Sequence, residues 1–196
     1  MNRKCLTVSA ILAMVLLSVA AGGCSPERKQ EQATLTMVST VKDPGPFDQA
    51  VKTAQLIVFG TVKSLGSPII SEAPPANPGQ VAFGRAVTVP VILEVAQVLK
   101  GNAKAGEIVT FRQLGGQVGQ STMSFPGEAK FQVGENVLLF LYEPTGIYKT
   151  WTGGALYADQ GKYVVDSLGV ASNDFRSETF PLEALKTQIS KALETK

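Results

Sequence analysis

The 196-residue chain contains no histidine and only two cysteines, Cys5 and Cys24. Without an imidazole, the chain cannot build a Ser-His-Asp triad, a Cys-His dyad or a zinc site with histidine ligands. Cys5 lies in a segment with the features of a removable signal, so the mature chain would keep one cysteine and could form no internal disulfide. Charged residues are also scarce, at 17%, whereas 44% of the residues are hydrophobic. This composition excludes a chain that is disordered throughout and suffices for one domain with a sizeable core.

The net charge of +2 comes from the N-terminus alone. Arg3 and Lys4 supply the excess, and from Cys24 onward the chain has 16 basic and 16 acidic residues. The basic residues are scattered, with no cluster beyond Arg28 and Lys29. Because nucleic-acid binding requires a concentration of positive charge, no nucleic-acid partner is expected.

Residues 1–23 have the order of a secretory signal peptide. A short basic region at 2–4 precedes an almost wholly apolar run at 5–20, and small residues follow it. The alternative is an uncleaved membrane-spanning helix, which needs about 20 apolar residues. The apolar run is slightly shorter than that and ends in two glycines. We therefore expect residues 1–23 to be a signal peptide that is removed on export.

The segment Ala21-Gly22-Gly23-Cys24 resembles the lipobox of bacterial lipoproteins, in which lipid is attached to the cysteine and cleavage occurs just before it. That family usually has leucine where this chain has Ala21. The resemblance implies that Cys24 becomes the first mature residue and carries a diacylglyceryl group, often with an amide-linked acyl chain. Two or three acyl chains give stable anchoring, which would place the protein on the extracytoplasmic face of a bacterial cell membrane. The alternative is a free cysteine after an ordinary signal peptide.

The composition predicts a flexible tether between the anchor and the domain. Residues 25–42 are rich in Glu, Gln, Lys, Thr and Ser, and their few apolar residues show no sustained period. The sequence Asp-Pro-Gly-Pro at 43–46 is typical of a turn that closes such a segment. We therefore expect a lipidated cysteine and tether over 24–45 and a single domain over 46–196, with one or two helical turns at 47–53.

Alternating and continuous apolar runs predict that this domain is built from strands. The long run at 86–99 alternates and must bend, and its Pro90, which has no N–H to donate, marks an edge or a bulge. The unbroken apolar run at 137–142 predicts a strand buried on both faces. Long loops are expected at 66–84, which is rich in proline, and at 115–130. The remaining strands are expected at 56–62, 107–114 and 162–166, with weaker candidates at 147–152 and 155–158.

The C-terminus has the pattern of an amphipathic helix. Leu182, Leu185, Ile189 and Leu193 recur at spacings of three and four residues, and Pro181 suits the first turn. This stripe favours a helix that covers one face of the sheet, with a partner-binding helix as the alternative. Together these elements predict a mainly β fold, a small OB-like antiparallel β-barrel with a C-terminal amphipathic helix.

Between residues 50 and 166 the chain contains, in order, the segments 54–62, 91–98, Leu99-Lys100-Gly101, Gly115-Gly116, 131–135, 137–141 and 160–163. Together they resemble a β-barrel domain of uncharacterised bacterial envelope and secreted proteins. More remotely they are similar to the netrin-like domain of metalloproteinase inhibitors, an OB-type barrel. That family is disulfide-linked and chelates its target's zinc through an unmodified N-terminal cysteine. Because this domain has no cysteine and Cys24 would carry lipid, inhibition by that mechanism is not expected.

A candidate ligand surface consists of Tyr148, Trp151 and Tyr157, with Arg112 as a further member. Aromatic side chains on an OB-type face can stack on sugars or bases. The alternative is packing in the core or at the barrel rim, which the spacing of Tyr148 and Trp151 favours, since residues three apart in a regular strand face opposite ways.

Two functions fit these observations. The first is a lipid-anchored, extracytoplasmic binding module that contacts another envelope protein or polymer and needs no metal or cofactor. The second is an enzyme that acts on an envelope polymer through carboxylates such as Glu94, Glu128 or Glu135, because a carboxylate pair can cleave glycosidic bonds without histidine. The sequence does not fix the distance between these carboxylates.

Overall fold

A computed structural model describes residues 34–36, 46–72, 85–125, 127–142 and 161–195. The expected signal at 1–23, Cys24, and the aromatic residues Tyr148, Trp151 and Tyr157 lie outside the described residues, as do the weaker strand candidates at 147–152 and 155–158. The chain divides into two compact units, and the second, Gln32–Lys196, holds every element described below.

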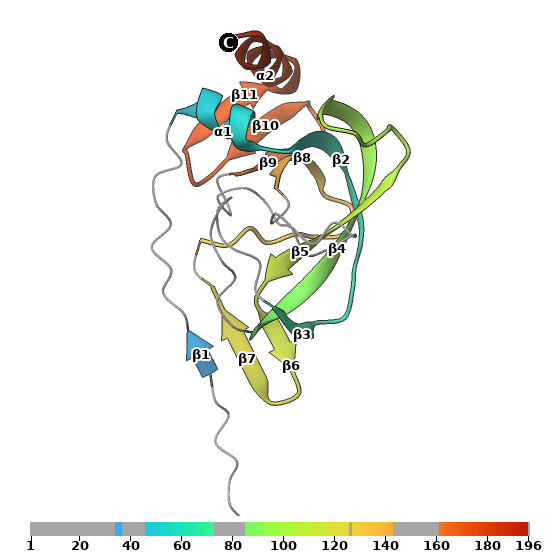
Figure 1. Cartoon of the computed structure of the whole chain (residues 1–196), viewed down its shortest axis with the longest axis vertical. Helices are drawn as coiled ribbons and strands as arrows, with labels where there is room; N and C mark the ends of the chain where they lie inside the picture. Colours follow the sequence, from blue (N-terminus) through green and yellow to red (C-terminus); the bar gives the residue numbers. More distant parts are fainter. Residues whose placement is uncertain (1–33, 37–45, 73–84, 126, 143–160, 196) are drawn as a thin grey trace, which may run out of the picture. The chain divides into compact units, whose positions relative to one another are not determined.

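The described elements pair into a large sheet and a small one (Figure 1). The large sheet has the order β11-β10-β9-β8-β2-β4-β3, with β5 on the second edge of β4, and all its pairings are antiparallel. The small sheet has the order β1-β7-β6. This mainly β fold with a C-terminal amphipathic helix confirms the fold class predicted from the sequence. The elements are β1 (Thr34–Thr36), α1 (Phe47–Thr53), β2 (Leu56–Leu65), β3 (Ile69–Glu72), β4 (Arg85–Lys100), β5 (Ile108–Leu114), β6 (Gly116–Val118), β7 (Ser121–Ser124), β8 (Asn136–Leu141), β9 (Lys162–Val165), β10 (Val170–Asn173), β11 (Glu178–Pro181) and α2 (Leu182–Glu194).

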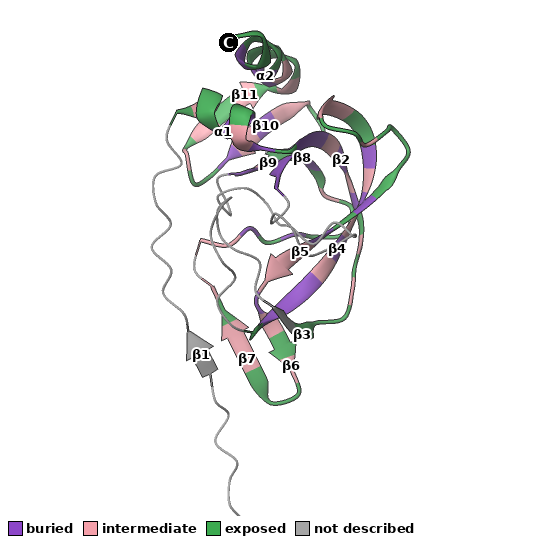
Figure 2. Ribbon diagram, viewed as in Figure 1, coloured by how far each residue is buried: buried purple, intermediate pink, exposed green. Residues whose placement is uncertain are grey.

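The central strands β2 and β8 separate two hydrophobic cores. On one face, Leu138 and Phe140 of β8 pack in a cluster with α1 and α2. On the other face, Val137, Leu139 and Leu141 pack in a second cluster with side chains of β4 and β5. All five of these side chains are at most 1% exposed, and Figure 2 shows the buried residues concentrated along these strands. The prediction that the run at 137–142 is buried on both faces is confirmed.

Pro90 lies where β4 changes its neighbour. On one edge, β4 pairs with β3 as far as Thr88 and with β2 from Val91 onward. Between them, the Pro90 carbonyl accepts a hydrogen bond from the Gly66 amide at 2.7 Å, and the missing N–H of proline falls at this junction. On the other edge, residues 88–94 of β4 pair with β5, on both sides of the proline. The proline therefore marks the boundary between two partner strands.

The helices cover the face that carries the first core cluster. Leu185 and Ile189 of α2 are fully buried there, as the sequence predicts, and Phe47 of α1 meets Phe140 edge-on with ring centroids 5.9 Å apart. Leu193 differs from the prediction, because it is 39% exposed and the small side chain of Ala192 takes the buried position. The stripe thus serves to cover the sheet. Within the described ranges, neither helix is long and apolar enough to cross a membrane.

The turn after β4 stabilises the end of α1. Lys100 donates hydrogen bonds to the carbonyls of Val51 and Lys52, at 2.9 and 2.8 Å, which are carbonyls of the last helical turn. Gly101 follows with φ of 98°, and a Cβ there would lie 2.7 Å from the Gln55 carbonyl oxygen. The Lys-Gly pair that contributes to the sequence resemblance therefore has a local structural reason.

Several short strands lie where the sequence predicts loops. β3 falls within 66–84, and the β6–β7 hairpin falls within 115–130. β10 and β11 follow the last strand that the sequence predicts, and β1, which pairs in parallel with β7, lies inside the expected tether. Each of these strands has three or four residues, too few for a clear alternation of apolar and polar positions.

Candidate functional site

A surface hollow of about 450 Å³ lies beside the β9–β10 hairpin. Its lining comes from three separate parts of the sequence: the segment before β8, strand β9, and strand β10 with the turn after it. It mixes charged, hydroxyl and apolar side chains. The lining residues are Glu128, Lys130, Lys162, Val164, Ser172, Asp174 and Phe175.

Strand register explains why this hollow forms. Val164 of β9 lies directly opposite Val137 of β8 on one side and Ser172 of β10 on the other. Residues opposite each other in a ladder share a face, so Val164 and Ser172 continue the face on which Val137 packs in the second core cluster. Over β9 this face opens to solvent, since Val164 is 36% exposed whereas Val137 is fully buried. The hollow is therefore an uncovered extension of a core face.

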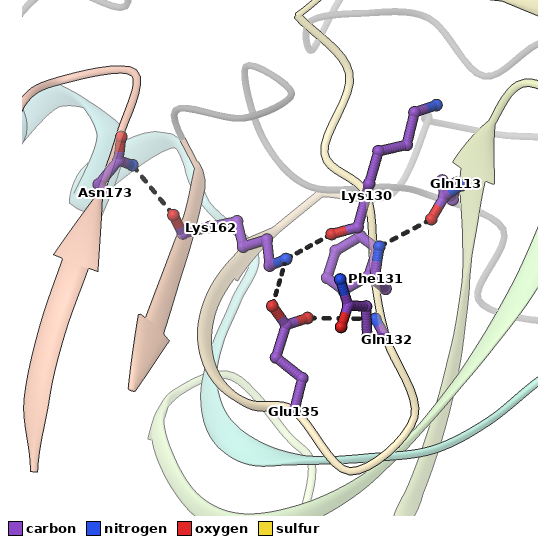
Figure 3. A network of polar contacts seen from close by, with 7 residues as sticks. All are labelled: Gln113, Lys130, Phe131, Gln132, Glu135, Lys162 and Asn173. Carbon is purple, nitrogen blue, oxygen red and sulfur yellow. Dashed lines mark hydrogen bonds and ion pairs between the residues drawn. The ribbon is translucent and has the colours of Figure 1, made fainter. Parts of the chain in front are cut away.

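Lys162 lines the hollow and is held by a polar network (Figure 3). Its ammonium forms an ion pair with Glu135 at 2.9 Å, donates to the Lys130 carbonyl and lies 4.7 Å from the centroid of the Phe131 ring. The side chains of Lys162 and Glu135 are only 10% and 16% exposed. Glu135 also accepts a hydrogen bond from the Gln132 amide at 3.3 Å. The charge of Lys162 is thus matched within the fold.

The other end of this network fixes the strands themselves. Asn173, which is 1% exposed, donates to the Lys162 carbonyl at 3.1 Å and accepts from the Arg176 amide at 2.9 Å. Gln113 of β5 accepts from the Phe131 amide at 2.9 Å. These bonds join β5, β9 and β10 to the segment before β8 and set the shape of the hollow.

Polar groups that face the hollow keep hydrogen-bonding capacity for a ligand. Lys130 is not one of them: its ammonium donates to the Leu114 carbonyl at 2.8 Å, and Figure 3 shows its backbone carbonyl, not its ammonium, turned toward Lys162. Among the described residues, no partner contacts the Ser172 hydroxyl or the Asp174 carboxylate. The Phe175 ring is 49% exposed beside them. The hollow therefore presents a hydroxyl, a carboxylate and an aromatic ring.

Two buried tyrosines lie behind this region. Burial raises the pKa of Tyr142, and the negative charge of Glu128 raises it further. Burial also raises the pKa of Tyr163, followed by the hydrogen bond that its hydroxyl donates to Glu178 at 2.8 Å. Both tyrosines are therefore neutral well above neutral pH, and neither adds a charge to the hollow.

The candidate ligand surface lies mostly outside the described residues, and the described residues singled out from the sequence do not form one site. Arg112 lies half-exposed on β5, opposite Pro90. Glu94 forms an ion pair with Lys63 at 2.8 Å, and both side chains are about half exposed. Of the three carboxylates considered for catalysis, Glu135 pairs with Lys162, and Glu128 lines the hollow.

No family model matches this chain. A comparison with curated proteins likewise finds no match. The residues described by the structure contain no group of three or more acidic, cysteine or histidine side chains arranged to hold a metal ion.

Sequence reasoning missed most of the hollow because its lining is assembled by strand pairing. Lys162, Ser172 and Asp174 carry no motif, and their neighbours in the hollow lie more than thirty positions away along the chain at Glu128. One signal was present in the sequence. Phe175 is a single aromatic residue within the polar stretch 172–177, a position where burial does not account for it.

Proposed function

We propose that the protein is a lipid-anchored binding module of the bacterial cell envelope, attached through Cys24 and facing away from the cytoplasm. The order of signal, lipobox and tether in the sequence supports the anchor. The folded domain supports the binding role, because its two faces differ. Helices cover one face over β9 and β10, whereas the other face opens into the hollow.

The observation that carries the proposal is the exposed Phe175 beside Ser172 and Asp174, whose side chains contact no partner among the described residues. A ligand site combines apolar surface with a few polar groups that converge on it. Glu135 and Lys162 bind each other, and their function is to hold the hollow's wall. The side chains that remain to contact a partner therefore lie on the opposite wall, formed by β10 and the turn after it.

The anchor is tested by mass spectrometry and fractionation of the wild-type protein and Cys24→Ala. We expect acyl chains on Cys24 of the wild type, and a Cys24→Ala variant that is folded, carries no lipid and leaves the membrane fraction. A wild-type mass without acyl chains, together with membrane retention of the variant, contradicts the lipoprotein interpretation.

The binding role is tested by photo-crosslinking in intact cells. A photoreactive amino acid at position 175 should capture a reproducible envelope component. The same group at position 48, on the exposed side of α1, is the matched control and should not. Equal capture from both positions would contradict a binding role for the hollow.

A second candidate function is supported by one specific arrangement. Glu128 and Asp174 line the same hollow, and two carboxylates that flank a bound sugar can hydrolyse a glycosidic bond. If the protein is such an enzyme, purified protein will shorten an envelope polysaccharide, and Glu128→Gln or Asp174→Asn will abolish the activity. Unchanged polysaccharide chains in this assay contradict the enzyme.

A further inference from the structure

We propose that the hollow binds an organic cation with an apolar stem, such as an alkylammonium ion, between the Asp174 carboxylate and the Phe175 ring. This inference rests on the proposed binding function and names its ligand class. It depends on a turn that is fixed in one conformation, on the charge of Asp174 and on the exposed ring of Phe175.

The turn after β10 holds Asp174 and Phe175 in place. The buried Asn173 side chain accepts a hydrogen bond from the Arg176 amide at 2.9 Å. The Ser177 amide donates to the Asp174 carbonyl at 3.3 Å. Among the described residues, Ser177 is the only one besides glycines with a positive φ, at 52°, and such a backbone persists only where the surrounding structure fixes it. The two side chains therefore line the hollow from a fixed backbone.

The other charged side chains of the hollow are engaged within the protein. The Lys162 ammonium lies 2.9 Å from its counter-charge in the ion pair described above. The Lys130 ammonium donates to the Leu114 carbonyl at the end of β5 and extends away from Lys162 (Figure 3). Glu128 also has partners within the protein, among them the Leu114 amide at 3.4 Å. The charge in the lining that has no partner among the described residues is therefore the Asp174 carboxylate.

The three groups left to a ligand all attract a positive charge. The Asp174 carboxylate accepts hydrogen bonds only, the Ser172 hydroxyl can accept them, and the face of the Phe175 ring is negative. An ammonium ion donates several hydrogen bonds and is attracted to all three. An anion would be repelled by Asp174, and an uncharged apolar ligand would remove water from that carboxylate without replacing its hydrogen bonds.

The hollow also has room for the stem that carries such a charge. Phe175 is 49% exposed and Val164 is 36% exposed, so both offer apolar surface. A volume of about 450 Å³ falls in the range of pockets that hold small ligands, about 300–1,000 Å³. The methylene groups of a lysine side chain pack on apolar surface while the ammonium reaches polar groups, and a free aliphatic amine has the same chemistry.

The test is an NMR titration of the isotope-labelled, lipidated full-length protein in an uncharged detergent. The probes are N-acetyl-lysine methylamide, butylamine and N-acetyl-norleucine methylamide, which has the lysine stem without its ammonium. We expect both amines to shift the backbone amide signals of residues 172–177. The norleucine probe should bind about tenfold more weakly than the lysine probe, because it lacks the charge that both the carboxylate and the ring attract. The Kd of the lysine probe should rise about threefold or more between about 0.05 and 0.5 M salt.

Two substitutions locate the site. Asp174→Asn removes the charge and Phe175→Ala removes the ring, so each should weaken binding of the lysine probe about threefold or more. The matched controls are Asp48→Asn, on the exposed side of α1, and Leu168→Ala, in the turn between β9 and β10, and both should leave the Kd unchanged. Tighter binding of the lysine probe than of butylamine identifies a protein side chain as the source of the ammonium, and equal binding identifies a free amine.

The inference is overturned if neither amine shifts the signals of residues 172–177, or if the norleucine probe binds as tightly as the lysine probe. It is also overturned if Asp174→Asn or Phe175→Ala binds as tightly as the wild type, or if salt leaves the Kd unchanged. The proposed binding function has its own test. Capture of an envelope component from position 175 together with failure of both amines would retain the module and refute the cation.

Discussion

The ion pair between Lys162 and Glu135 allows a quantitative test of the hollow's wall. Glu135→Gln keeps the shape of the side chain but leaves the Lys162 ammonium, 10% exposed, without its counter-charge. Removing one partner of a fully buried pair destabilises by about 3–5 kcal/mol. Since both side chains retain some contact with solvent, we expect about 2–3 kcal/mol for Glu135→Gln, and a similar loss for Lys162→Met.

The double variant separates mutual dependence from independent contributions. In Glu135→Gln/Lys162→Met no charge is left unpaired, and a methionine at position 162 can still pack on the Phe131 ring. We therefore expect it to be more stable than the sum of the single effects by about 1–2 kcal/mol. The free energy of unfolding is measured for the four proteins by urea denaturation.

Lys63 and Glu94 provide the matched control. They form an ion pair at 2.8 Å, but their side chains are 52% and 46% exposed. Exposed pairs contribute about 0–1 kcal/mol because water screens them. The equivalent cycle of Lys63→Met and Glu94→Gln should therefore show less than about 0.5 kcal/mol of coupling. Equal coupling in both cycles, or additive effects at Lys162 and Glu135, would refute the reasoning.

Three other predictions follow from the packing and the titrating groups. Gly60→Ala should destabilise the folded domain by about 3 kcal/mol or more, because the added Cβ would lie 2.3 Å from the Glu94 carbonyl oxygen. The variant should have a lower melting temperature, and an unchanged melting temperature would contradict this steric argument. Lys100→Met should cost about 1 kcal/mol by urea denaturation, since α1 loses two hydrogen bonds to its last carbonyls, and no change would contradict a capping role. Burial raises the pKa of Tyr142 and Tyr163 above the ordinary value of 10.0. The folded state therefore binds their protons more tightly than the unfolded state does, and their stabilisation is lost as pH rises above about 10. Tyr163→Phe should lose less stability than the wild type between neutral pH and pH 11, and equal losses would contradict the assignment.

The sequence predicted the elements that are long enough to show a period. The alternation over 86–99 identified β4, the continuous apolar run identified β8, and the spacing of Leu185 and Ile189 identified the buried face of α2. In each case the buried positions are apolar and recur with the period of the strand or helix, so the sequence shows the pattern. Leu193 departs from the prediction because the buried face of α2 continues from Ile189 to Ala192, three residues on, which leaves Leu193 39% exposed.

The short strands could not be predicted because their stability comes from their neighbours. β10 is held by hydrogen bonds to β9 and β11 and by Asn173, none of which leaves an apolar pattern in a four-residue strand. β3 lies within a segment rich in proline, although it begins with the apolar pair Ile69 and Ile70. The hollow could not be predicted for the same reason, because pairing of β9 with β8 and β10 is what brings Lys162 and Ser172 to one face.

The two faces of the β9–β10 hairpin have separate tasks. Tyr163 and Ala171 point toward the helices and belong to the first core cluster, whereas Val164 and Ser172 point into the hollow. Because alternate residues of a strand lie on opposite faces, substitutions on the hollow side leave the buried side chains in place. The hairpin can therefore vary Val164 and Ser172, though not Lys162, without losing the contacts that hold it to the domain, which is the property expected of a strand pair that presents a binding surface.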